Sequence, residues 1–152
     1  MSDCQCKGKE NNEIFCNCQF EEFTLNDGME GSVFVPIILT TDTISVTEKD
    51  WVAKIDTMVD LQANVNGPEA FGVLYVVERI TGGNAITLCS YPVSDERQDI
   101  FTLTPSYTIC DTPPIGCHTY RLSILDNKCE PAFLILTSTC RCINVSTFQN
   151  GK

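Results

Sequence analysis

The chain has 152 residues, with 20 Asp or Glu against 10 Lys or Arg, and a formal net charge of −10. This length fits one domain with an ordinary core, and the scarcity of basic residues leaves no surface for phosphates, so we expect no nucleic-acid partner. No segment approaches the roughly 18 apolar residues of a membrane helix, so we expect no membrane partner either.

The N-terminal segment carries four of the ten cysteines, as two Cys-x-Cys pairs: Cys4 with Cys6, and Cys16 with Cys18. Residues 1–12 are polar and charged and lack the apolar stretch of a secretory signal, so none is expected. Residues 14–20 alternate like a strand that carries its cysteines on one face. We therefore predict an extended connector arm over residues 1–22, followed by one domain over residues 23–152.

Strand signals dominate the rest of the chain, and helix signals are almost absent. Between residues 51 and 65 the odd positions are nearly all apolar and the even positions largely polar, which is the period of a half-buried strand. This run is longer than a typical strand, so we expect a bend or bulge near Thr57 or Met58. A hairpin turn is predicted at Gly82-Gly83-Asn84, and further strands at residues 32–40, 43–46, 71–80, 85–91, 99–104, 118–125, 133–139 and 141–148.

Short strands separated by Gly, Pro, Asn and Asp turns predict an all-β fold. We expect a single β-sandwich of jelly-roll type with about eight strands. An immunoglobulin-like sandwich is the alternative. It is weakened because Trp51 precedes every cysteine of the body, whereas immunoglobulin domains place a tryptophan between their two core cysteines.

The spacing of the cysteines points to bonds between chains. In an extended chain, side chains two residues apart lie about 6.5–7 Å from each other, at the limit for a disulfide, so each Cys-x-Cys pair suits two outside partners. A third pair, Cys140 and Cys142, should lie on the face opposite Ile143 and Val145 and be accessible. Strand addition by the arm could bring two cysteine pairs into register, and makes Cys140 and Cys142 the predicted intermolecular acceptors. The alternative is an arm that folds back on its own domain, with every bond intramolecular.

Cys110 and Cys117 bracket a loop with two prolines and a glycine. We predict an intrachain disulfide between them, since closing so short a loop stabilises a fold by about 2–3 kcal/mol. Cys89 and Cys129 have no obvious mates.

Metal binding and catalysis have weaker support. The chain lacks the Cys-x-x-Cys spacing of zinc modules, and His118 is its only histidine. Cys117 and His118 are adjacent, so in a strand they point to opposite faces and cannot pair as nucleophile and base. Asp56 and Asp60 share a face that we interpret as solvated. We expect no enzyme, no cofactor and no small-molecule substrate; a metal-binding protein of a reducing compartment and a monomeric ligand-binding sandwich remain alternatives.

The arm, the cysteine pairs and the expected sandwich together resemble the cysteine-rich jelly-roll subunits of bacterial endospore surfaces, particularly those of spore appendage fibres. The likeness is one of layout and covers most of the chain. It implies a structural homopolymer on a spore surface, reached by mother-cell lysis or another route without a cleaved signal, in which subunits join by strand addition. It also implies intermolecular disulfides donated by Cys4, Cys6, Cys16 and Cys18. Spaced rather than adjacent arm cysteines depart from the appendage pattern and leave open how many neighbours each arm reaches.

Overall fold

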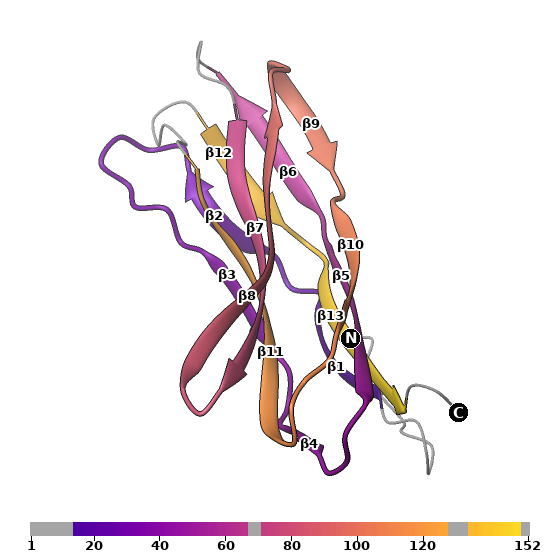
Figure 1. Cartoon of the computed structure of the whole chain (residues 1–152). Helices are drawn as coiled ribbons and strands as arrows, with labels where there is room; N and C mark the ends of the chain where they lie inside the picture. The colour runs from indigo at the N-terminus through magenta and orange to yellow at the C-terminus, as the bar shows by residue number, and fades with distance from the viewer. Residues whose placement is uncertain (1–13, 67–70, 128–133, 150–152) are drawn as a thin grey trace.

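The computed structural model describes residues 14–66, 71–127 and 134–149 (Figure 1). Within these residues every regular element is a β-strand, and none is a helix that could cross a membrane. The fold is all-β, and its sheets pack as a sandwich, which confirms the predicted fold class at this level. The strands are β1 (Ile14–Gln19), β2 (Phe23–Asp27), β3 (Ile37–Thr40), β4 (Ile44–Val46), β5 (Trp51–Val59), β6 (Leu61–Val65), β7 (Phe71–Thr81), β8 (Asn84–Asp95), β9 (Asp99–Leu103), β10 (Ser106–Asp111), β11 (Gly116–Asp126), β12 (Leu134–Ser138) and β13 (Arg141–Gln149).

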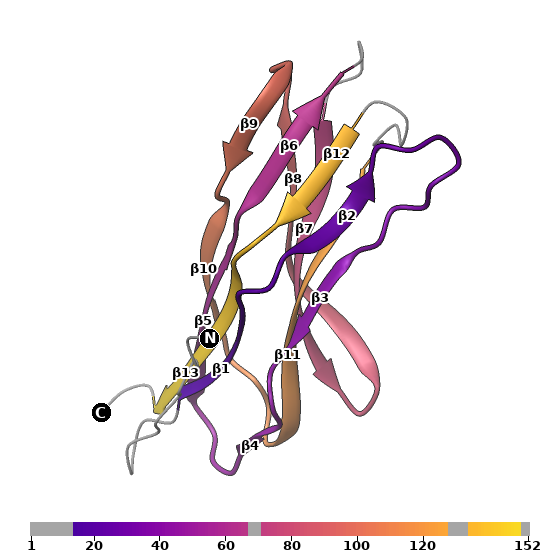
Figure 2. The same cartoon turned by 180° about the vertical axis from the view of Figure 1, so that it is seen from behind.

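The first layer consists of four long runs of chain, each interrupted once. One half of the layer has the strand order β1-β13-β5-β10, and the other half has the order β2-β12-β6-β9. The same four runs therefore lie side by side in both halves, as the two opposite views show (Figures 1 and 2). All pairings in this layer are antiparallel. The interruptions fall at residues 20–22, 60, 104–105 and 139–140.

The second layer has the order β3-β11-β7-β8, with β4 also paired to β11. The predicted hairpin between β7 and β8 is confirmed. Thr81 pairs with Asn84 around Gly82 and Gly83, whose φ angles of 56° and 82° lie in the left-handed region that glycine adopts without strain. Two successive residues with positive φ are what a tight turn between twisted strands requires.

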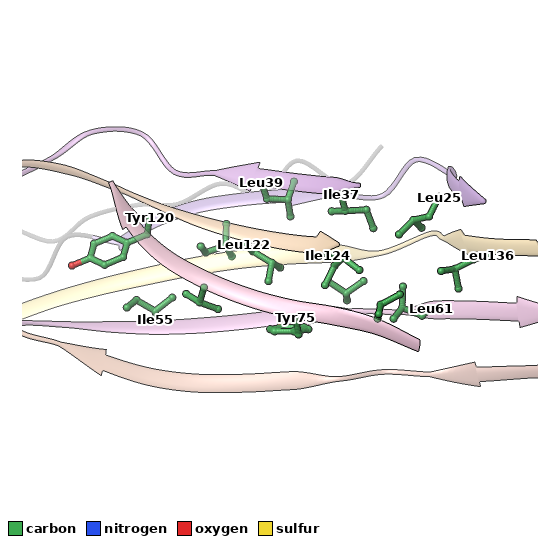
Figure 3. Packing of buried hydrophobic residues seen from close by; sticks show 14 of the residues in the cluster. Leu25, Ile37, Leu39, Ile55, Leu61, Tyr75, Tyr120, Leu122, Ile124 and Leu136 are labelled. Carbon is green, nitrogen blue, oxygen red and sulfur yellow. The ribbon is translucent and has the colours of Figure 1, made fainter. Parts of the chain in front are cut away.

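The core lies between the two layers (Figure 3). Ile55 and Leu61 of the first layer meet Tyr75, Leu122 and Ile124 of the second, and each of these side chains is 0 % exposed. The predicted alternation over residues 51–65 is confirmed, because the odd positions from 53 to 65 are all buried. The bulge predicted near Thr57 or Met58 is not present: β5 pairs with both neighbours without a register shift through these residues. The ladder breaks at Asp60 instead.

Other strand predictions need correction at their edges. The strand expected over residues 32–40 begins only at Ile37, since Pro36 before it has no N–H to give to a ladder. Two strands, β2 and β10, were not predicted. In β10, Tyr107 and Ile109 alternate with more exposed residues, a period-2 signal that was hidden because Cys110 was interpreted as the start of a closed loop.

The predicted boundary between arm and domain also differs from the structure. The arm belongs to the sandwich from Ile14 onward, because β1 pairs with β13 of the same chain over six residues. Without β1, β13 would be an edge strand with its backbone N–H and C=O groups unpaired on one side, and docking of the arm satisfies them.

Candidate functional site

The candidate site is the outer face of the first layer where β1 lies on β13. The antiparallel register sets Cys18 opposite Cys142 and Cys16 opposite Asn144. Residues directly opposite in such a ladder have Cα atoms about 4.5–5.5 Å apart, within the range that a disulfide spans. The ladder therefore brings one predicted donor, Cys18, against one predicted acceptor, Cys142.

Alternation along β13 decides which side chains reach this face. Ile143 and Val145 are 0 % exposed and point into the core, whereas Cys142 and Asn144 are half-buried on the opposite face. The predicted orientation of Cys142 is thus confirmed. On β1, Phe15 packs against the core cluster, and the cysteines alternate with it. The Cys18 thiol donates to Asn144 Oδ1 at 3.8 Å, which agrees with a shared outer face.

Asp60 holds the segment that precedes Cys142. Its carboxylate accepts four hydrogen bonds from residues 138–140: from Ser138 Oγ at 3.0 Å, the Thr139 N–H at 2.8 Å, Thr139 Oγ1 at 2.6 Å and the Cys140 N–H at 2.8 Å. The Asp60 N–H donates in return to the Cys140 carbonyl at 2.9 Å. Burial alone would raise the pKa of Asp60, but the hydrogen bonds outweigh it and the pKa falls below 3.8. Asp60 therefore remains a carboxylate that fixes the bend between β12 and β13.

Arg141 links this bend to the arm. It is 3 % exposed, and its guanidinium donates to Gln19 Oε1 at 3.3 Å and to the Glu21 carbonyl at 2.9 Å. The guanidinium also lies 5.3 Å from the centre of the Phe23 ring. Burial lowers the pKa of Arg141, although the Asp60 carboxylate acts in the opposite direction. One buried cation thus connects β13 to the junction between β1 and β2.

Cys140 lies between these two charged residues and is half-buried. Burial is the main cause that raises the pKa of Cys140. The adjacent Cys142 thiol and the Asp60 carboxylate raise this pKa further. Since the thiolate is the nucleophile in disulfide exchange, this environment keeps Cys140 less reactive than an open thiol. The predicted accessibility of Cys140 is therefore only partly realised.

The structure assigns a disulfide to Cys16. This bond lies within one chain, whereas the prediction gave Cys16 a bond to a neighbouring subunit. Cys4, Cys6 and Cys129 lie outside the described residues, so their predicted roles stay predictions. Cys89 is a thiol packed against the core, and burial raises its pKa.

The predicted bond between Cys110 and Cys117 is wrong: both are exposed thiols. Cys110 points outward from the first layer, because the next residue, Asp111, points inward and accepts hydrogen bonds from Arg79 and Tyr120 of the second layer. Cys117 points outward from the second layer, because His118 beside it is 1 % exposed. Packed sheets lie about 10 Å apart, so two outward side chains on different sheets cannot bridge.

Among the described residues, His118 has no hydrogen bond to a cysteine or a carboxylate. His118 points inward, where its ring nitrogens lie 2.8 Å from Thr81 Oγ1 and 2.7 Å from the Pro114 carbonyl. The exposed Cys117 side chain points the other way, as predicted, and its sulfur lies 3.6 Å from Ser45 Oγ. Over residues 14–66, 71–127 and 134–149, no group of three or more His, Cys, Asp or Glu side chains is placed to hold a metal ion.

Sequence reasoning missed the two charged residues of this site. Asp60 was interpreted as part of a solvated face, and Arg141 was not singled out. The available signal was local: each charge lies at a break in an otherwise regular strand pattern. Most of their partners, however, come from segments 78 to 122 residues away in sequence, which no local pattern indicates.

Comparison with known proteins adds little to this geometry. Neither a family model nor a curated protein matches the chain. The structure of dimeric latent PorU from Porphyromonas gingivalis is similar with a TM-score of 0.48 and 10 % identity, over 95 % of this chain and 13 % of that chain. The structure of infectious bursal disease virus Gt strain is similar with a TM-score of 0.37 and 11 % identity, over 97 % of this chain and 34 % of that chain. This chain spans only a minor part of either protein, and likenesses this distant carry no argument about its function.

Proposed function

We propose that the chain is a structural, non-enzymatic subunit that polymerises by exchange of its arm strand, with disulfides that make the polymer covalent. The site of action is outside the cell, on a bacterial spore surface, as the resemblance in layout implies. The partner is a second copy of the chain, and no nucleic acid, membrane or small-molecule substrate takes part.

We also propose that the sandwich is a jelly roll. We count β1 with β2, β3 with β4, β5 with β6, β9 with β10 and β12 with β13 as one run each, and β7, β8 and β11 as single runs, which gives eight runs over the described residues. The order of these runs in the two layers supports the jelly-roll topology. The first, eighth, third and sixth runs form one layer, and the second, seventh, fourth and fifth form the other. This is the arrangement of two Greek keys wound into a double sheet.

The observation that carries the functional proposal is the register of β1 on β13. Among the described strands β1 pairs with β13 alone, at the edge of its sheet, and residues 20–22 connect it to β2. An identical strand from a second chain would make the same ladder, so exchange conserves the backbone hydrogen bonds and requires little net free energy. The contacts that must be remade are also conserved, for example Asn17 Nδ2 to the Thr40 carbonyl at 3.0 Å.

Exchange places cysteines of different chains opposite each other. With the arm supplied by a neighbour, the same register sets Cys18 of one subunit against Cys142 of the next. A bond there would make a strand contact of modest strength covalent, while the domain on either side keeps its fold. Each chain donates one arm and accepts one, so the contact is head-to-tail and gives an open polymer unless the rotation closes a ring.

Negative-stain electron microscopy and non-reducing gels of the purified full-length chain test the proposal. Oxidised material should contain polymers that survive boiling in detergent and release monomers only when a reductant is added. Cys142→Ser should give fewer and shorter detergent-resistant polymers, whereas the control Cys89→Ser, which alters a core-facing thiol away from the arm, should match the wild type. Monomers alone in the oxidised wild type would contradict the proposal.

A further inference from the structure

Cys110 and Cys117 occupy opposite outer faces of the sandwich at one end of the molecule. The connection between β10 and β11 joins them near β4 (Figures 1 and 2). Both side chains are exposed, and Ile115 between them is 57 % exposed. One thiol therefore faces away from the first layer and the other faces away from the second.

Neither thiol has a mate within reach among the described cysteines. On the first layer, Cys110 aligns with Lys54 on β5, and Lys54 aligns with Ser146 on β13. Cys110 is therefore two strand spacings, about 9.5 Å, from β13, beyond the span of a disulfide to Cys142. On the second layer, Cys89 packs against the core, whereas Cys117 points away from it.

We infer that Cys110 and Cys117 are lateral cross-linking positions, each bonded to a cysteine of a different neighbouring chain. The inference rests on the proposed function and adds a second direction of assembly to it. Arm exchange joins subunits edge to edge, in the plane of the first layer. Bonds from Cys110 and Cys117 join subunits along the normal to the layers, one on each side.

The opposite directions of the two thiols determine how many neighbours each subunit can bond through them. A single exposed cysteine closes a dimer and then stops, because no further thiol is available. Two thiols that point away from each other cannot both bond to the same flat neighbour, so each subunit joins two others. Combined with the arm, these links give a sheet or bundle of chains rather than a single fibre.

Thiol–disulfide exchange with a low-molecular-weight disulfide supplies the oxidant. The thiolate of one chain attacks this disulfide, forms a mixed disulfide and releases one small thiol. A thiolate of the second chain then attacks the protein sulfur of that mixed disulfide, forms the interchain bond and releases a second small thiol. Two protein thiols are oxidised, one small disulfide is reduced to two thiols, and the two protons leave on those thiols.

The test uses full-length chains oxidised with glutathione disulfide in a background in which Cys4, Cys6, Cys16, Cys18, Cys129, Cys140 and Cys142 are all replaced by Ser. No arm bond can form in this background, and Cys89, Cys110 and Cys117 are the cysteines that remain. Non-reducing gels should still show a ladder of covalent multimers. Adding Cys110→Ser should limit the products to dimers at most, and adding Cys117→Ser as well should leave monomers. Cys89→Ser in the same background is the control and should leave the ladder unchanged. Maleimide labelling of assembled wild type should find Cys110 and Cys117 at least tenfold less reactive than in reduced monomer.

Two results would overturn the inference: a ladder that persists without Cys110 and Cys117, or full maleimide labelling of both thiols in the assembled wild type. Either result leaves the arm link intact as long as wild-type polymers still require a reductant to dissociate. The converse result is a set of Cys142→Ser polymers that are as long as those of the wild type and still depend on Cys110 and Cys117. That result would support the lateral links and contradict the proposed bond between Cys18 and Cys142.

Discussion

Replacement of Asp60 tests whether its carboxylate holds the bend that presents the β13 cysteines. Asp60→Ala removes the acceptor of four hydrogen bonds, two of them from the backbone N–H groups of Thr139 and Cys140. Hydrogen bonds to a charged group contribute about 1.5–3 kcal/mol each when buried. Asp60 is only half-buried, so in the variant water will replace part of the lost hydrogen-bond energy. The hydroxyls of Ser138 and Thr139 can also turn to solvent. We expect the free energy of unfolding to fall by about 2–4 kcal/mol, mainly from the two backbone donors.

Asp60→Asn keeps the shape and one acceptor oxygen, so its loss should be about half as large, roughly 1–2 kcal/mol. The pKa of Asp60 is lowered from 3.8 by folding, so its stabilisation is complete above pH 3.8 and is lost as the pH falls through the lower folded value. The stability gap between the wild type and Asp60→Asn should therefore be constant near neutral pH and should narrow below pH 3.8.

Urea denaturation followed by circular dichroism, repeated from pH 7 to pH 3, measures this gap. The matched control is Asp56→Asn, whose carboxylate accepts one hydrogen bond from Thr108 at the surface and should change stability by less than about 1 kcal/mol. A loss below about 0.5 kcal/mol for Asp60→Ala, or a gap that widens in acid, would refute the role assigned to Asp60.

Three further predictions concern the arm, the loop cysteines and the hydrogen bond from Tyr120 to Asp111, which joins the two layers. Removal of residues 1–20 should leave a folded domain whose free energy of unfolding in urea is about 2–4 kcal/mol lower, because β13 loses its edge partner. A synthetic arm peptide should restore the urea midpoint of unfolding, and a truncated chain with an unchanged midpoint would show that β1 does not dock. Cys110→Ser and Cys117→Ser should each leave the melting temperature of the reduced chain within about 2 °C of the wild type, since no bond joins them, whereas a drop of 5–10 °C or more, on the order expected for a lost staple, would restore the intrachain disulfide. Tyr120→Phe removes the hydroxyl that donates to Asp111 Oδ2 at 2.8 Å and should lower stability by about 1–2 kcal/mol in the same urea assay, with no loss arguing that water replaces the hydroxyl.

The sequence predicts the layers of this fold better than it predicts the contacts between distant segments. Alternation over residues 51–65 identified a long half-buried strand, and Gly82-Gly83 identified a hairpin, because both signals are carried by neighbouring residues. The docking of residues 14–19 on their own domain could not be predicted, since a strand pattern does not specify which sheet edge it joins, or whether that edge belongs to the same chain.

The error at Cys110 and Cys117 has a related cause. A short loop with two prolines and a glycine brings its ends close along the chain, which favours a disulfide. The sandwich instead uses this loop to pass from one layer to the other, so that the two side chains leave from opposite faces. Asp60 and Arg141 were missed because charged residues at a strand break look solvated until the packed segments around them are known.

The central claim is that the arm strand bonds to a neighbouring chain in the register that it adopts within its own. Polymers assembled from an equal mixture of unlabelled and nitrogen-15-labelled chains test it most directly, through mass spectrometry of the disulfide-linked peptides. The account predicts hybrid peptides in which Cys18 of one label is bonded to Cys142 of the other. Peptides joining Cys18 to Cys142 only within a single label, or assembled polymers without this bond, would contradict it.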